Sequence, residues 1–123
     1  MKGRTTNKLH AVKTVVDGIE WASKAEASRY VELKLLQRAG KISNLRWQVP
    51  YELIPKQKKA DGTTERKCEY IADFVYDTDG RTVVEDVKGY RDPSSATYAK
   101  FVLKRKMMLY IHGIEVKEYP PKH

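Results

Sequence analysis

The chain has 123 residues, with 24 Lys and Arg against 16 Asp and Glu, and it contains one cysteine. No stretch approaches the ~20 apolar residues that a membrane-spanning helix needs, and the first residues lack the apolar core of a secretory signal. Because the lone Cys68 cannot form an internal disulfide, the sequence favours a reducing, cytoplasmic setting. Length and composition therefore predict one small soluble domain with no membrane partner.

Acidic residues are concentrated in one part of this basic chain. The formal net charge of +8 predicts an anionic partner such as a nucleic acid. Residues 61–86 contain eight acids and three bases, a net charge of −5, so the other 97 residues carry +13. A divalent metal between the protein and its polyanion explains such an acidic segment. The alternative is that most of these acids are solvated turn residues.

The first part of the chain predicts a basic arm followed by a helix. Residues 1–22 are basic and weakly patterned, and we expect a mobile or partner-docking arm there. Residues 23–26 have the S-x-x-E form of a helix start, and Gly40 provides a stop. The sequence therefore predicts an amphipathic helix over residues 24–39.

The middle of the chain predicts three strands. Apolar residues alternate from residue 45 to residue 53, and Pro50 bends this strand or confines it to a sheet edge. The segments that follow are typical of a hairpin preceded by a long connection: a basic loop at 55–67, a strand at 69–76, a turn at 77–80 and a strand at 81–88.

The last part of the chain predicts a second helix and a short final strand. Ser95 is a plausible cap for a helix that runs to about Ile111, and residues 114–119 supply the strand. The predicted order is α-β-β-β-α-β, an α/β fold with a mixed sheet flanked by helices. We expect a single domain over residues 23–119, with residues 120–123 as a tail.

Two aspartates on the predicted hairpin form the candidate chemical site. Asp73 lies among apolar neighbours on one strand and Asp86 lies on the next, so they are expected to be close at the end of the hairpin far from its turn. Two carboxylates ~4 Å apart repel by roughly 4 kcal/mol at an effective dielectric constant of ~20, which a bridging cation relieves. Oxygen ligands without histidine or thiol partners favour Mg²⁺ or Mn²⁺. Lys88 is positioned to orient a water and to stabilise charge on a phosphate. The alternative is an ordinary ion pair of these aspartates with Lys88 at the strand end.

This pattern resembles the PD-(D/E)XK nuclease superfamily. Asp73 is followed after thirteen residues by Asp86-Val87-Lys88, with a helix on each side, although Ala72 stands where the family name has proline. The resemblance runs from about residue 23 to residue 119 and implies a restriction-endonuclease-like core. Four segments also resemble a small phage-associated branch that is grouped with Holliday-junction resolvases. These segments are Glu26, residues 70–74, residues 85–89 and residues 104–106.

The resemblance also implies roles for individual residues. Glu26 corresponds to an acidic residue on the first helix that completes the metal site, and the main-chain carbonyl of Val87 is a further expected ligand. The alternative for Glu26 is a capping-box contact back to Ser23. Glu85 points to the opposite face of its strand from Asp86, where we expect it to be solvated or paired.

Together these features predict a Mg²⁺-dependent endodeoxyribonuclease, with Mn²⁺ as a substitute, that cuts branched DNA as a phage or prophage Holliday-junction resolvase in a bacterial host. The two-fold symmetry of a four-way junction favours a homodimer. Alternatives are a nicking or flap-cutting nuclease of the same superfamily, or a non-catalytic basic DNA-binding protein. The basic residues expected to contact DNA phosphates are Lys2, Arg4, Lys8 and Lys13 in the arm, Lys56, Lys58, Lys59 and Lys67 in the loop, and Lys104, Arg105 and Lys106 on the second helix.

Overall fold

The computed structural model describes residues 13–89 and 91–121. Its elements follow in chain order: β1 (Thr14–Val16), β2 (Ile19–Trp21), α1 (Lys24–Arg38), β3 (Ser43–Ile54), β4 (Gln57–Lys58), β5 (Thr64–Glu65), β6 (Cys68–Thr78), β7 (Arg81–Val87), α2 (Ala96–Met107), the π-helical turn η2 (Met108–His112) and β8 (Lys117–Tyr119). None of the described helices is long and apolar enough to cross a membrane.

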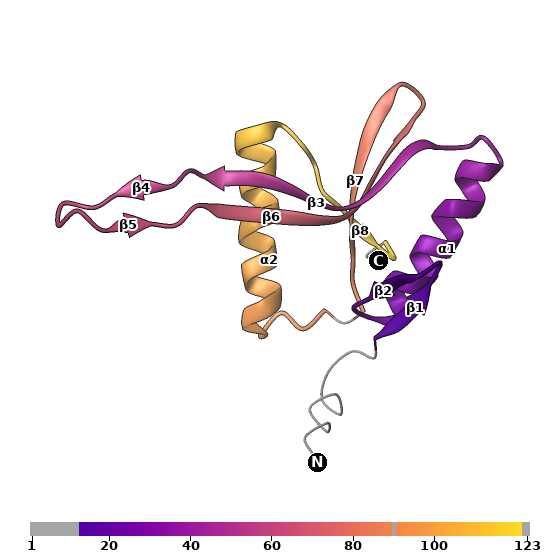
Figure 1. Ribbon diagram of the computed structural model, residues 1–123, viewed down its shortest axis with the longest axis horizontal. Helices are drawn as coiled ribbons and strands as arrows, with labels where there is room; N and C mark the ends of the chain where they lie inside the picture. The colour runs from indigo at the N-terminus through magenta and orange to yellow at the C-terminus, as the bar shows by residue number, and fades with distance from the viewer. Residues whose placement is uncertain (1–12, 90, 122–123) are drawn as a thin grey trace, which may run out of the picture.

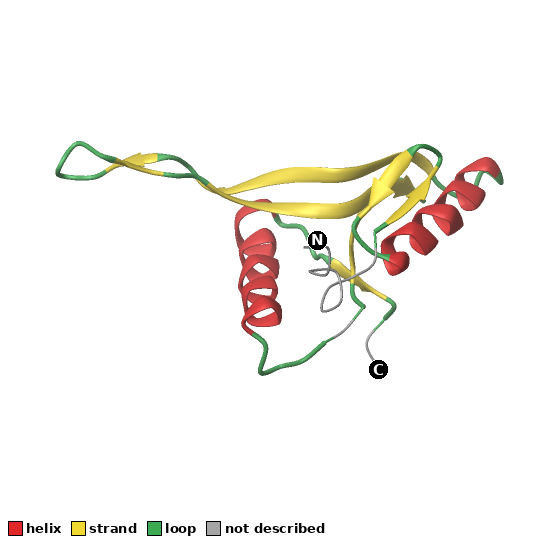
Figure 2. Ribbon diagram, turned by 60° about the horizontal axis from the view of Figure 1, so that its bottom comes forward, coloured by secondary structure: helices red, strands yellow, loops and turns green. Residues whose placement is uncertain are grey.

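A four-stranded mixed sheet organises the molecule, which confirms the predicted α/β class. The strand order is β3-β6-β7-β8, with antiparallel pairs up to β7 and a parallel β7–β8 pair. Strand β3 lies at the sheet edge, as Pro50 indicated. Helices α1 and α2 lie toward opposite ends of the long β3–β6 pair, and β7 and β8 run between them (Figure 1 and Figure 2).

Short sequence motifs mark the starts of both helices and the turn of the β6–β7 hairpin. The Ser23 hydroxyl accepts the Glu26 N–H at the start of α1, and the Ser95 hydroxyl accepts the Tyr98 N–H at the start of α2. A two-residue turn joins β6 to β7, and both of its residues, Asp79 and Gly80, have the positive φ angles that such a hairpin turn requires.

Strand β6 changes the core that it faces at Asp73. Tyr70 and Ala72 pack in the core cluster beneath α2, whereas Phe74 and Tyr76, which have the same parity along the strand, pack in the cluster beneath α1. In a regular strand residues of one parity share one face. The opposite strand departs from regular geometry at Gln48, whose φ is 53°. The strand therefore turns over between the two clusters, and Asp73 lies at the crossing.

Residues 14–21 correct the expected N-terminal arm. They form the β1–β2 hairpin, whose pairing runs from Thr14 opposite Trp21 to Val16 opposite Ile19. Trp21 is only 2% exposed, and its ring centroid lies 4.6 Å from that of Tyr30 on α1. The hairpin is thus part of the core, so the domain begins before residue 23. Three expected DNA contacts, Lys2, Arg4 and Lys8, lie outside the described residues.

The expected loop at 55–67 is also corrected. Strands β4 and β5 pair with each other, with Gln57 opposite Glu65 and Lys58 opposite Thr64. They continue the β3–β6 pair as a narrow ribbon that extends away from the body of the protein (Figure 1). We call residues 55–67 the β4–β5 arm.

Candidate active site

Asp73 lies where the pairing of β6 with β7 ends. The ladder runs from Thr78 opposite Arg81 to Phe74 opposite Glu85. Beyond this last pair a side chain replaces the main chain as hydrogen-bond acceptor, because the Asp73 Oδ2 accepts the Val87 N–H at 2.8 Å. Asp73 and Asp86 are therefore both at the end of the hairpin far from its turn, as the sequence predicted.

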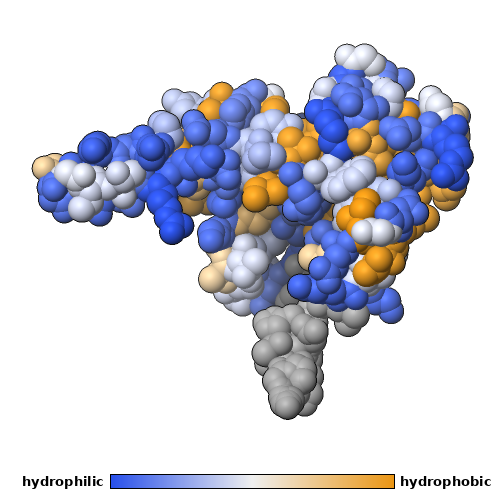
Figure 3. All heavy atoms as spheres, in the orientation of Figure 1, coloured by the Kyte–Doolittle hydropathy of each residue, from blue (hydrophilic) through white to orange (hydrophobic). Residues whose placement is uncertain are grey.

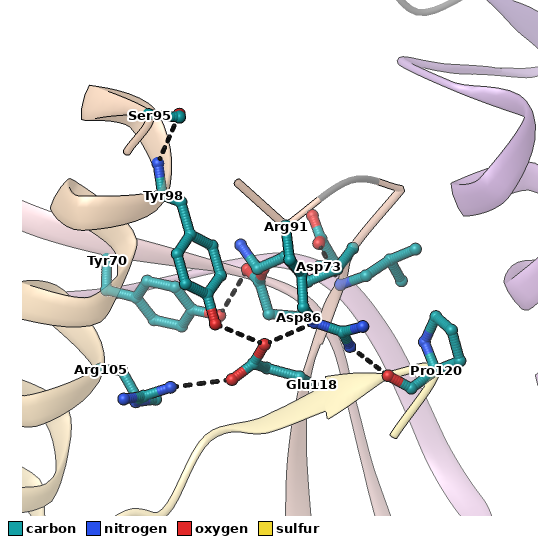
Figure 4. A network of polar contacts seen from close by, with 11 residues as sticks. Tyr70, Asp73, Asp86, Arg91, Ser95, Tyr98, Arg105, Glu118 and Pro120 are labelled. Carbon is teal, nitrogen blue, oxygen red and sulfur yellow. Dashed lines mark hydrogen bonds and ion pairs between the residues drawn. The ribbon is translucent and has the colours of Figure 1, made fainter. Parts of the chain in front are cut away.

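Asp86 is held by two neighbours. Its side chain is 10% exposed; the Tyr70 hydroxyl donates to Oδ1 at 2.8 Å and the Lys88 ammonium lies 2.5 Å from Oδ2. Lys88 in turn lies 3.4 Å from the centroid of the Phe101 ring on α2. Figure 4 shows the Tyr70 side chain reaching across to Asp86 from the neighbouring strand. Sequence reasoning missed Tyr70 and Phe101, because a tyrosine in a strand and a phenylalanine on a helix stripe carry only a core signal.

Glu26 completes a carboxylate cluster from the first turn of α1. Its N–H is capped by Ser23, but no described hydrogen bond joins its carboxylate to Ser23, so the reciprocal half of the capping box is absent from the described residues. Burial raises the pKa of Glu26, and the nearby charge of Asp86 raises it further. The side chain is thus close enough to Asp86 to feel its charge.

The electrostatics of Asp73 show the same coupling. Its pKa is raised to about 7, first by burial and then by the charge of Asp86, with a smaller contribution from Glu26; the Val87 N–H and Lys88 act in the opposite direction. Three carboxylates thus share one region with one ammonium group. The cluster of Glu26, Asp73 and Asp86, which we call the acidic cluster, has more negative charge than Lys88 can balance.

The structure contains an ion pair between Lys88 and Asp86. Such a pair is what the alternative interpretation, an ordinary ion pair at the strand end, predicts. Lys88 contacts Asp86 directly, while Asp73 and Glu26 have no cationic partner in direct contact among the described residues. Within residues 13–89 and 91–121, no group of three or more His, Cys, Asp or Glu side chains is arranged closely enough to hold a metal ion. Donor chemistry and excess charge suit Mg²⁺, whereas direct coordination by all three carboxylates requires them to move closer together.

Two cavities open onto the acidic cluster. One of about 310 Å³ is bordered by Asp86 and Lys88 and also by Lys100 of α2. The other, of about 250 Å³, is bordered by Glu26 and by Gln48 of β3. Asp86 is therefore accessible to small polar groups from the α2 side of the sheet, and Glu26 from the α1 side.

Glu85 faces away from this cluster, as expected. It is 4% exposed, and Arg29 of α1 donates to both of its carboxylate oxygens, at 2.9 and 2.6 Å. The Tyr76 hydroxyl donates to the same carboxylate. Glu85 is thus one half of a closed ion pair between the sheet and α1.

A second polar network lies beside Asp86 on β8. Glu118, opposite Asp86 in the parallel β7–β8 pair, accepts hydrogen bonds from Arg91, Tyr98 and Arg105 (Figure 4). Burial acts to raise the pKa of Glu118, but these hydrogen bonds outweigh it and hold the pKa below its ordinary value. The network ties the start and the end of α2 to the sheet next to the acidic cluster.

The expected DNA-contacting residues of α2 differ in their availability. The Lys104 ammonium donates to the Glu69 carbonyl at 2.7 Å, and Arg105 pairs with Glu118 at 2.8 Å. Lys106 is exposed. Lys104 and Arg105 therefore already have protein partners, and Lys106 is the member of this group that is open to a ligand. Lys13 is also exposed, just before β1.

Fold and site define an α/β protein with a half-buried acidic cluster and an adjacent lysine between two helices. The chain belongs to the family described as "Protein of unknown function (DUF1064)", which matches residues 6–118. The match covers both the β1–β2 hairpin and the β4–β5 arm. No curated protein and no solved structure matches the chain.

Proposed function

We propose that this protein is a metal-dependent, structure-specific DNA endonuclease of the PD-(D/E)XK type, and that it cuts branched DNA as a phage Holliday-junction resolvase. The observation that carries the proposal is the electrostatic coupling of Glu26, Asp73 and Asp86 around one lysine. Repelling carboxylates that open onto two cavities contribute little to a fold, but they suit a site whose charge is balanced by a bound cation.

Asp73 and Asp86, with Glu26 and the main-chain carbonyl of Val87, would hold Mg²⁺, and Mn²⁺ would substitute because it accepts the same oxygen ligands. When bound, the ion polarises the phosphate and lowers the pKa of water. The remaining chemistry belongs to the chain.

Lys88 is the group that orients the attacking water and stabilises negative charge on the phosphate. Its ammonium is anchored by Asp86 on one side and by the face of Phe101 on the other, which limits its movement. Attack of water at phosphorus in line with the leaving oxygen breaks the bond from phosphorus to O3′. The water contributes the new oxygen of the 5′-phosphate, and one of its protons passes to the departing 3′-oxygen, which leaves as a hydroxyl.

The proposed substrate, a four-way DNA junction, leads us to expect that the protein is a homodimer. A four-way junction has near two-fold symmetry and requires two paired nicks, so two protomers related by a two-fold axis suit it. Light scattering on the purified protein with and without junction DNA tests this part; a monomer in both states contradicts it.

The direct test is incubation with a labelled four-way junction and a matched linear duplex, in Mg²⁺ or in EDTA. Wild type is expected to cut the junction in Mg²⁺ only, while Asp73→Asn and Lys88→Ala lose activity. An intact junction in Mg²⁺ overturns the resolvase proposal. Equal cutting of the linear duplex leaves a nuclease of another specificity, such as a nicking or flap-cutting enzyme. Undiminished cutting by Asp73→Asn shows that the assigned site is wrong.

The rival is a non-catalytic DNA-binding protein, which the Lys88–Asp86 ion pair favours because it gives that lysine a structural role. The two proposals differ in their response to metal. A binder that lacks a metal site keeps the same thermal stability in Mg²⁺ and in EDTA at matched ionic strength, whereas the nuclease gains stability in Mg²⁺.

A further inference from the structure

The β4–β5 arm is a charged projection without a core of its own. Every residue from 55 to 67 is exposed, and none belongs to either core cluster. The segment contains no Val, Ile, Leu, Met, Phe, Tyr or Trp, and its five bases outnumber its two acids. Figure 3 shows the arm as a mostly hydrophilic extension. Because an isolated two-stranded ribbon gains little stability in water, its use lies in what it presents to a partner.

The bases divide between the two faces of the arm. Lys58 is opposite Thr64, and successive residues alternate between faces, so Lys56 and Arg66, two residues away along each strand, share the face of Lys58. We call Lys56, Lys58 and Arg66 the cationic face.

The other face is largely neutralised from within the protein. Lys59 lies 3.9 Å from the Glu65 carboxylate, and Lys67 lies 3.2 Å from Glu69. No ion pair among the described residues involves a member of the cationic face. Of the two faces, only the cationic face has its charge fully available to an external anion.

The position of the arm determines how far an anion bound to the cationic face lies from the acidic cluster. The arm continues strand β6, and a strand rises about 3.3 Å per residue. Arg66 is therefore roughly 23 Å from Asp73 along the strand, and Thr64, opposite Lys58, roughly 30 Å. Successive phosphates on one strand of duplex DNA are about 3.4 Å apart along the axis, so these distances correspond to about seven to nine base pairs.

We infer that the cationic face of the β4–β5 arm binds the phosphate backbone of duplex DNA about seven to nine base pairs from the position of cleavage. The inference rests on the proposed function for the identity of the polyanion. The arm binds the duplex at a fixed distance from the acidic cluster. The contact depends on the unpaired bases of the cationic face more than on the net charge of the arm.

The salt dependence of DNA binding tests this contact without catalysis. Binding of a fluorescent duplex is followed by anisotropy in EDTA for wild type and for the triple variant Lys56→Ala/Lys58→Ala/Arg66→Ala. Each lost phosphate contact reduces the slope of log K against log salt by about 0.9, so the triple variant is expected to lose about 2.7 from the slope. An unchanged slope overturns the inference.

Single substitutions provide a matched control, because Lys58→Ala and Lys59→Ala change the net charge equally on adjacent residues. Lys58→Ala is expected to reduce the slope by about 0.9, and Lys59→Ala by much less, since Lys59 is already paired with Glu65. Equal effects would mean that net charge alone governs binding, and they overturn the assignment to one face. Circular dichroism checks that both variants fold.

Duplex length and cleavage separate this inference from the proposed nuclease activity. The advantage of wild type over the triple variant is expected to vanish on four-way junctions whose arms extend only about six base pairs beyond the cleavage position. If the triple variant binds long duplexes as well as wild type while junctions are still cut, the arm inference fails and the nuclease stands. If no DNA is cut but the slope difference persists, the nuclease fails and the phosphate contact of the cationic face stands.

Discussion

Strand β7 carries two adjacent buried carboxylates with opposite surroundings. Glu85 faces α1 and Asp86 faces α2, and each accepts a hydrogen bond from a tyrosine and contacts one basic side chain. Glu85 has a bidentate arginine that matches its charge and geometry. Asp86 has a single ammonium and two further carboxylates nearby, and it borders a cavity. Burial alone therefore does not distinguish these two acids; the local balance of charge does.

The largest difference between the two acids is expected in cleavage activity. If Asp86 holds the metal as proposed, Asp86→Asn is expected to slow junction cleavage by about 10³-fold, equivalent to ~4 kcal/mol of transition-state stabilisation. Glu85→Gln is expected to change the cleavage rate little per folded molecule. Single-turnover cleavage at saturating enzyme measures both. Equal losses of activity would contradict the division of roles between the two acids.

For the stability of the fold, the surroundings of Glu85 are expected to matter more than those of Asp86. Arg29→Ala leaves Glu85 buried without its counter-charge, and breaking a buried pair in this way costs about 3 kcal/mol of the free energy of unfolding. Arg38→Ala is a suitable control, because Arg38 lies on the same helix but is exposed. Urea unfolding followed by circular dichroism measures both variants, and similar midpoints for the two would remove the basis for calling Glu85 structural.

The pH dependence of stability is a third test, centred on Asp73. In the folded protein its pKa is raised to about 7 from an ordinary value of 3.8, so between these values the folded state binds more protons than the unfolded chain. Stability therefore falls as pH rises through this window. Relative to Asp73→Asn, wild type is expected to lose about 2 kcal/mol between pH 5 and pH 7 in EDTA. Parallel profiles for the two proteins would show that folding does not raise the pKa of Asp73.

Metal binding supplies the smallest expected effect. Mg²⁺ at about ten times its Kd is expected to stabilise wild type by about 1.4 kcal/mol at pH 8, which is a Tm increase of a few degrees. Asp73→Asn is expected to show a much smaller increase, while Glu85→Gln, which leaves the acidic cluster intact, responds like wild type. Differential scanning fluorimetry with Mg²⁺ titration, at constant ionic strength, provides the measurement. An equal response of Asp73→Asn contradicts metal binding at this residue.

Features that depend on local chemistry were predictable from the sequence. Ser23 and Ser95 predicted both helix starts, and the Asp79-Gly80 turn predicted the β6–β7 hairpin. That hairpin in turn placed Asp73 and Asp86 at the same end of the sheet. These inferences succeed because each depends on residues within a few positions of one another.

Features that depend on distant contacts were missed. Tyr70 reaches Asp86 because β6 turns over at Asp73, and no nearby residue indicates that twist. Glu118 joins the site through a parallel pairing with β7, which sequence patterns do not specify. The β1–β2 hairpin and the β4–β5 arm were missed for a simpler reason, since strands of two or three residues are too short to show an alternating pattern.

The edge strand β3 has a consequence for how copies of the protein can associate. Among the described residues no strand pairs with its outer side, and an unpaired strand edge is a common route to aggregation and to continuous intermolecular sheets. Pro50 has no N–H to offer an incoming strand, and the positive φ of Gln48 interrupts the regular pleat two residues earlier. Both interruptions lie in the middle of the strand, so an incoming chain finds no long regular edge. Assembly through other surfaces is thereby favoured.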